Sequence, residues 1–121
     1  MPPPSPLAIA TGAVNRLVKE ESTYHKELVD GETELKKLEE KLKSGEQDED
    51  GNAEFLIRQQ RTSVEQTKAV FSPLKKKIEA AVEKLNDLAQ SAEKDGIAPP
   101  AELENAKTAL ANAKAALEKS S

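Results

Sequence analysis

The sequence contains no cysteine and no tryptophan, and its only aromatic residues are Tyr24, Phe55 and Phe71. Without cysteine, the chain can form neither a disulfide nor a thiolate metal site. So few aromatic side chains argue against a sheet protein or a deep globular core. No apolar run approaches the roughly 20 residues that a membrane-spanning helix needs. These absences leave a class of proteins built from long helices.

The charged residues make up 33% of the 121 residues, and alanine, glutamate, lysine and leucine dominate the composition. That mixture is typical of long helices or a coiled coil. Residues 46–51 carry four acids and no base, which equals the whole net charge of −4. The remaining charges are balanced and interspersed, so no nucleic-acid or membrane-surface binding is expected. The short run Lys75–Lys77 is interpreted as a solubilising feature of a helix.

Apolar residues recur with helical periodicity in three segments, which predicts an all-α fold. We expect one elongated, antiparallel, coiled-coil-like three-helix bundle with up-down-up topology, because short connections make neighbouring helices antiparallel. The expected single domain, 1–121, has a flexible Pro-rich N-terminus at 1–5, an acidic linker at 45–52, and helices at about 6–44, 53–94 and 100–119.

Local signals at the helix ends support these bounds. Ser5 can cap the first helix with Pro6 at its first helical position. Gly45 and Gly96 can adopt the left-handed conformation that ends a helix. Pro73 lies inside the second helix, where it removes a backbone hydrogen bond, so we expect a kink there. A complete break into two helices is the alternative.

The three helices have unequal lengths, at about 55–60 Å for the first two and about 30 Å for the third. The third helix can therefore cover only the start of the first and the end of the second. Antiparallel pairing about Asp48 places Phe71 near Tyr24 or His25. Where three helices meet, Ala13, Val18, Val82 and Ala89 widen the apolar stripe.

The seam positions of each helix follow heptad spacing. In the first helix they are 7, 10, 14, 17, 21, 24, 28, 31, 35, 38 and 42; in the second they are 57, 60, 64, 67, 71, 74, 78, 81, 85, 88 and 92. In the third they are Leu103, Ala106, Leu110, Ala113 and Leu117. The four exceptions to apolar character, Glu21, Gly31, Gln60 and Thr67, all fall in the half where only two helices are expected.

Residues 11–20 read TGAVNRLVKE and are followed by Tyr24 and by Lys26 and Glu27. This segment resembles the first helix of the tubulin-folding cofactor A family. Residues 71–73, FSP, and 78–81, IEAA, resemble the second helix of that family with its internal proline. The acidic turn and the last helix fit in order and length. The Pro-rich start and the Ala-rich third helix depart from the family pattern.

The resemblance implies a non-catalytic chaperone of the cytoplasm, associated with the cytoskeleton and microtubules. Such a protein captures β-tubulin after its release from the cytosolic chaperonin and passes it toward assembly of the αβ heterodimer. It implies no cofactor, and other tubulin-folding cofactors are further candidate partners. A monomer and a homodimer both remain open. The start of the chain lacks the basic and apolar regions of a secretory signal, which agrees with a cytoplasmic location.

Six residues of the motif are the candidate partner-binding residues: Arg16, Lys19, Glu20, Tyr24, Lys26 and Glu27. Ala13, Val14, Leu17 and Val18 are assigned to packing instead. The alternative for the charged residues is a solvated face with pairs such as Arg16–Glu20, and the alternative for Tyr24 is the core. The thinner half, about residues 20–44 and 53–73, is the expected tubulin-binding surface.

Other functions have weaker support. Residues 46–51 imitate the start of a calcium loop, but Ile57 stands where the bidentate glutamate is required. His25 is the only histidine, so no metal set can form around it, and it is interpreted as a surface residue beside the seam. No phosphate-binding loop or catalytic motif is present, which argues against an enzyme. A generic coiled-coil or spectrin-like module and a membrane-surface helical bundle remain the rival interpretations.

Overall fold

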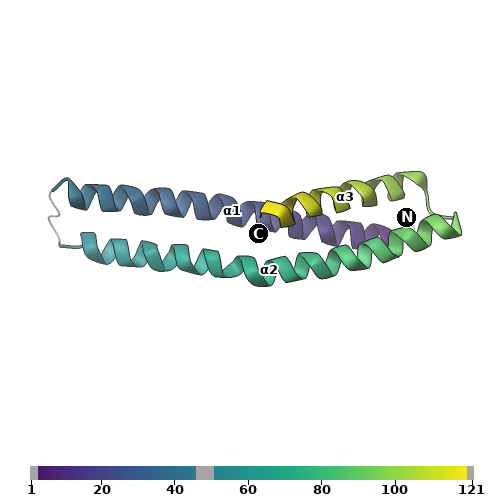
Figure 1. The fold of residues 1–121 in the computed structure, drawn as a ribbon, viewed down its shortest axis with the longest axis horizontal. Coiled ribbons are helices and arrows are strands. Elements are labelled where there is room, and N and C mark those ends of the chain that lie inside the picture. The colour runs from purple at the N-terminus through teal and green to yellow at the C-terminus, as the bar shows by residue number, and fades with distance from the viewer. Residues whose placement is uncertain (1–2, 46–50, 120–121) are drawn as a thin grey trace. The chain divides into compact units, whose positions relative to one another are not determined.

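The computed structural model describes residues 3–45 and 51–119. These residues form three helices and no strand: α1 (Pro6–Lys43), α2 (Ala53–Asp95) and α3 (Pro100–Lys119). The predicted all-α three-helix bundle is therefore confirmed (Figure 1). Most of the expected acidic linker and calcium-like loop, 46–50, lies outside the described residues, as do residues 1–2 of the Pro-rich start.

The chain divides into two compact units. The three-helix unit comprises Met1–Ser22 and Ser72–Ser121, and the two-helix unit comprises Thr23–Phe71. Within the three-helix unit, α3 lies along the first part of α1 and the last part of α2 (Figure 1). Within the two-helix unit, α1 and α2 lie side by side and antiparallel (Figure 1).

The start of α1 is capped as its sequence predicts. The backbone amide of Ala8 donates a hydrogen bond to Ser5 Oγ at 3.1 Å. The same hydroxyl donates to Glu102 Oε1 at 2.6 Å and so joins the first turns of α1 and α3. One side chain therefore satisfies an orphan amide of the helix end and also links two helices of the three-helix unit.

Replacing Ser5 with alanine is expected to lower the free energy of unfolding by about 1 kcal/mol, because it removes the cap. Urea unfolding followed by circular dichroism measures this change. Ser91→Ala is the matched control, since Ser91 is exposed within α2, and its expected effect is within about 0.5 kcal/mol. A Ser5→Ala variant as stable as the control would contradict the capping role.

The helix ends also follow the predicted glycines. Gly45 has a φ of 74° and Gly96 a φ of 68°, both in the left-handed region where glycine carries no steric penalty. Pro73 lies inside α2, which is a single helix from Ala53 to Asp95. The alternative of a break into two helices is therefore not observed, whereas the kink remains a prediction. One missing hydrogen bond does not interrupt a helix that packs along its length.

The core of the three-helix unit contains the predicted seam residues of α1 and α2. Val14, Ile78 and Leu85 are fully buried. In α3 the prediction was right for Ala106 and Ala113, which are buried, and wrong for the three leucines of the seam, which are half-buried: Leu103, Leu110 and Leu117. Ala109 and Ala116, outside the predicted seam, are buried as well. A face of methyl groups lets α3 approach its neighbours closely, and the longer leucine side chains then lie at the edges of the contact.

Glu21 also departs from the expected arrangement. It was placed in the thinner half, but it belongs to the three-helix unit, where its exposed fraction is 3% and it makes a polar interaction. The boundary between the units follows Ser22, whereas the length argument ended the three-helix region near Val18. The thickly packed unit therefore extends one helical turn further along α1 than the sequence predicts.

Candidate functional site

The motif of residues 11–27 contributes to both units. Val14 and Thr11 are buried, and Thr11 Oγ1 donates to the carbonyl oxygen of Leu7 at 2.9 Å, so its hydroxyl is satisfied within α1. Ala13, Leu17 and Val18 are half-buried, in agreement with their assignment to packing.

The six candidate binding residues are divided between the units. Arg16, Lys19 and Glu20 are exposed in the three-helix unit, and Lys26 and Glu27 are exposed in the two-helix unit, where Tyr24 is half-buried. Within the described residues, Arg16 and Glu20 form no ion pair with each other, so the pair named in the alternative interpretation of a solvated face is not observed. Arg16 and Glu20 therefore do not stabilise α1 through an ion pair with each other.

The contact between His25 and Phe71 confirms the predicted pairing of the first two helices. The two ring centroids are 4.5 Å apart and the ring planes are inclined by 32°. Both residues are half-buried in the two-helix unit. His25 was interpreted as a surface residue, but it is half-buried and packs against an aromatic ring beside the seam. Among the described residues, no cluster of three or more metal-ligating side chains is found.

Two of the predicted seam exceptions meet across the helix pair. Gln60 Nε2 donates a hydrogen bond to the backbone carbonyl of Gly31 at 3.0 Å. A Cβ atom built at Gly31 would lie 3.3 Å from Val64 Cγ2 and 3.5 Å from Gln60 Nε2. The glycine therefore provides the close approach that lets a glutamine side chain reach the opposite backbone.

Exposed apolar side chains are concentrated on the two-helix unit. Of the six large apolar residues exposed in the described parts of the chain, Val29, Leu42, Phe55 and Leu56 belong to it. Leu42 was predicted to lie in the seam but is 45% exposed in the last turn of α1. Phe55 and Leu56 were not predicted as site residues. They are large apolar residues that directly precede Ile57, the first seam residue of α2, and so lie outside the seam. Apolar residues outside a seam are the signal that could have identified them.

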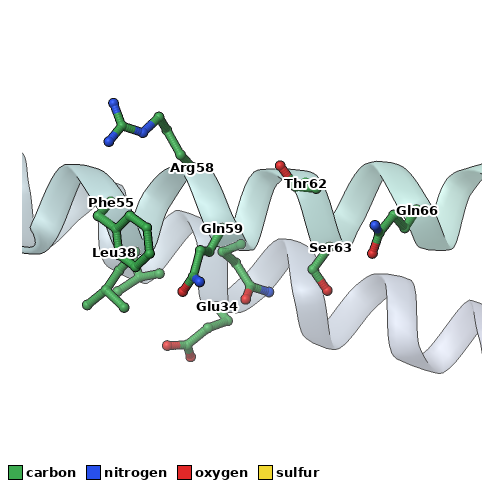
Figure 2. Close-up of a pocket in the computed structure, with 10 residues that line it drawn as sticks. Glu34, Leu38, Phe55, Arg58, Gln59, Thr62, Ser63 and Gln66 are labelled. Carbon is green, nitrogen blue, oxygen red and sulfur yellow. The ribbon is translucent and has the colours of Figure 1, made fainter.

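Phe55 and Leu56 line an open groove of about 790 Å³, which we call the Phe55 groove. Only two of its ten lining residues, Glu34 and Arg58, are charged. Figure 2 shows the Phe55 ring beside Leu38 at one end of the groove and Gln66 toward the other. The groove therefore has an apolar end and an end lined by uncharged polar side chains, among them Ser63 and Gln66.

A second groove on the same unit, of about 510 Å³, shares no lining residue with the first. We call it the charged groove, because five of its seven lining residues are charged: Lys36, Glu39, Glu40, Lys43 and Arg61. Arg61 and Glu39 form an ion pair across it at 3.2 Å, with both side chains about half exposed. Such a pair contributes little stability, but it partners two of the five charged residues of this groove within the unit.

The two grooves therefore offer a partner exposed apolar side chains in one and exposed charges in the other. No helix in the described parts of the chain is both long and apolar enough to cross a membrane.

Comparison with known proteins gives one match. The model of a family described as tubulin binding cofactor A matches residues 2–110, which is nearly the whole chain. No curated protein and no solved structure matches it. The family match agrees with the resemblance carried by residues 11–27 and 71–81.

Proposed function

The chain belongs to the tubulin binding cofactor A family, a family of non-catalytic, chaperone-type, tubulin-binding cofactors, and from this premise we propose that it captures β-tubulin. The bound form is the folding intermediate that leaves the cytosolic chaperonin, and the chain passes it toward assembly of the αβ heterodimer. The place of action is then the cytoplasm, in association with the cytoskeleton. Further partners in this proposal are the other tubulin-folding cofactors.

The observation that carries this proposal beyond the family match is the exposed apolar surface of the two-helix unit. Phe55 and Leu56 are 50% and 45% exposed in a chain of which 33% is charged. A partially folded polypeptide exposes apolar surface of its own, and burial of both surfaces against each other is favourable. A chaperone that needs no nucleotide can hold its client by this burial alone.

The proposal assigns the exposed charges of the motif to the same interaction. Arg16, Lys19 and Glu20 in the three-helix unit, with Tyr24, Lys26 and Glu27 in the two-helix unit, are proposed to contact tubulin. Their exposure supports this assignment, since all but Tyr24 are exposed and Tyr24 is half-buried. Charges at the edge of an interface mainly set specificity and the association rate. All three helices are proposed to act as one domain of residues 1–121.

The test is a binding assay with radiolabelled β-tubulin released from purified chaperonin, in which the complex is separated on a native gel. Binding of β-tubulin, with no cosedimentation on assembled microtubules, is the expected result. Cosedimentation with polymer and no binding of free β-tubulin would instead support a coiled-coil scaffold. Salt-sensitive binding to liposomes, with no tubulin binding, would support a membrane-surface bundle.

Reversing the charges of Arg16 and Lys19 to glutamate is expected to weaken β-tubulin binding about tenfold, since charge pairs at an interface edge contribute on the order of 1 kcal/mol. The loss should appear in the association rate and diminish at high salt. The matched control is Lys76→Glu with Lys77→Glu, two exposed lysines of the same three-helix unit outside the motif. Equal losses in both variants would show only a general effect of net charge.

A further inference from the structure

We propose that the Phe55 groove binds an amphipathic helix of the tubulin polypeptide, about three turns long. This inference rests on the proposed function and specifies which part of the surface holds the client and in what conformation. The groove comprises Leu38 of α1 and Phe55, Leu56, Gln59, Ser63 and Gln66 of α2, with Glu34 and Arg58 as its charged members.

The chemistry of this groove differs from that of a solvated helix surface. A third of the residues in the chain are charged. Among the ten residues that line the Phe55 groove, only two are charged. The charged groove of the same unit has five charged residues among seven. Solvated faces of helix pairs are usually covered by charged side chains, and the charged groove fits that description. The uncharged side chains of the Phe55 groove cost less to desolvate than the charged side chains of the charged groove.

The backbone around the groove favours a helix over an extended segment. Each lining residue lies within α1 or α2, whose amides and carbonyls are already paired along the helices. An extended peptide binds mainly by pairing with an open strand edge, and a helix surface has none. A groove between two helices fits the apolar stripe of a third helix, with anchors at positions i, i+3 or i+4, and i+7.

The length of the groove sets the length of the bound helix. Phe55 and Gln66 stand at opposite ends of the lining along α2 (Figure 2). Eleven residue steps of an α-helix span about 16 Å, which corresponds to about three turns of a helix bound alongside. Its apolar anchors would lie against Leu38, Phe55 and Leu56, and its polar residues would face Ser63 and Gln66.

Charge complementarity fixes which edge of the bound helix faces α1. Glu34 is the charged residue that lines the α1 side of the groove. Arg58 is on the α2 side and points away from α1 (Figure 2). The bound helix therefore carries lysine or arginine on the edge toward α1 and an acidic residue on the edge toward Arg58.

The first test replaces Phe55 and Leu56 with alanine and measures binding of chaperonin-released β-tubulin. Truncating the anchors of a central pocket weakens binding by about 30-fold or more. Ile9→Ala is the matched control, because Ile9 is 58% exposed but lies in the three-helix unit and does not line the groove; its binding should equal that of the wild type. Far-ultraviolet circular dichroism verifies that each variant remains helical.

The second test reverses one acid on each side of α1. Glu34→Lys should weaken binding about fivefold and reduce its dependence on salt. Glu32→Lys is the control and should leave binding unchanged. Glu32 is exposed, and residues two apart face different sides of a helix. Hydrogen exchange of the complex should show protection of a three-turn helix of tubulin.

The outcomes separate the two proposals. If the wild type binds β-tubulin and the Phe55 and Leu56 variant binds equally well, the groove proposal is overturned and the proposed function stands. If the wild type binds no β-tubulin, the proposed function fails and the groove proposal falls with it. If the substitutions leave tubulin binding intact but convert a dimer into a monomer in analytical ultracentrifugation, the groove holds a second copy of the chain instead.

Discussion

Replacing Leu85 with alanine is expected to lower the free energy of unfolding by about 3 kcal/mol, the largest single effect we predict for a conservative substitution in this chain. The Leu85 side chain is 0% exposed in the three-helix unit. Truncation loses the favourable free energy of transferring the side chain out of water. It also leaves a cavity that the surrounding helices cannot close. Urea unfolding monitored by circular dichroism at 222 nm provides the measurement.

The control for this substitution is Ile97→Ala. Ile97 is 84% exposed, although it is as apolar as Leu85, so its truncation should change the free energy of unfolding by no more than about 0.5 kcal/mol. A loss below about 1 kcal/mol for Leu85→Ala would show that this position is not enclosed by all three helices.

The second prediction tests which face of α3 is buried. Ala113→Leu should lower the free energy of unfolding by about 2 kcal/mol, because Ala113 is 0% exposed and a larger side chain must displace its neighbours. Leu110→Ala should cost only about 1 kcal/mol, since Leu110 is half-buried. Unfolding of both variants under the same conditions gives the ranking directly.

Heptad spacing placed both Ala113 and Leu110 in the seam, and this ranking tests which of the two is enclosed by the other helices. A seam with Leu110 at its centre would make Leu110→Ala the more damaging substitution. If Leu110→Ala were indeed the more destabilising of the two, the alanine face of α3 would not be its buried face.

The helices and their ends could be predicted because their signals are local. Ser5 caps the backbone only three residues away, and Gly45 and Gly96 end their helices through their own φ angles. The pairing of His25 with Phe71 was also predictable, since antiparallel pairing needs only the position of the turn. None of these features depends on which side chains lie opposite.

The buried face of α3 could not be predicted in the same way. Leucines recur every seven residues on one side of this helix, and alanines at 106, 109, 113 and 116 form a second apolar row beside them. Periodicity shows that both rows are apolar but does not rank them. Close approach of three helices selects the small side chains, and that selection is a tertiary effect.

The candidate site was predictable only in part. The motif of residues 11–27 was identified by resemblance, and the structure shows its charged residues exposed without testing what they bind. Phe55 and Leu56 were not predicted as site residues because they lie outside the heptad pattern, and the pattern alone does not distinguish a binding residue from any other exposed apolar residue. Their significance depends on Leu38, which is remote in sequence but lines the same groove.

The hydrogen bond from Gln60 to Gly31 has a consequence for the alignment of the two-helix unit. If α2 slipped along α1 by one heptad in either direction, Gln60 would face Leu38 or Tyr24 in place of Gly31. A bulky side chain there would separate the helices and leave the half-buried amide of Gln60 without its hydrogen bond. Apolar seam residues tolerate such a slip more easily, because one leucine can replace another as a neighbour. The polar interruption of the seam thus selects a single stagger of the two helices, as buried polar residues do in coiled coils.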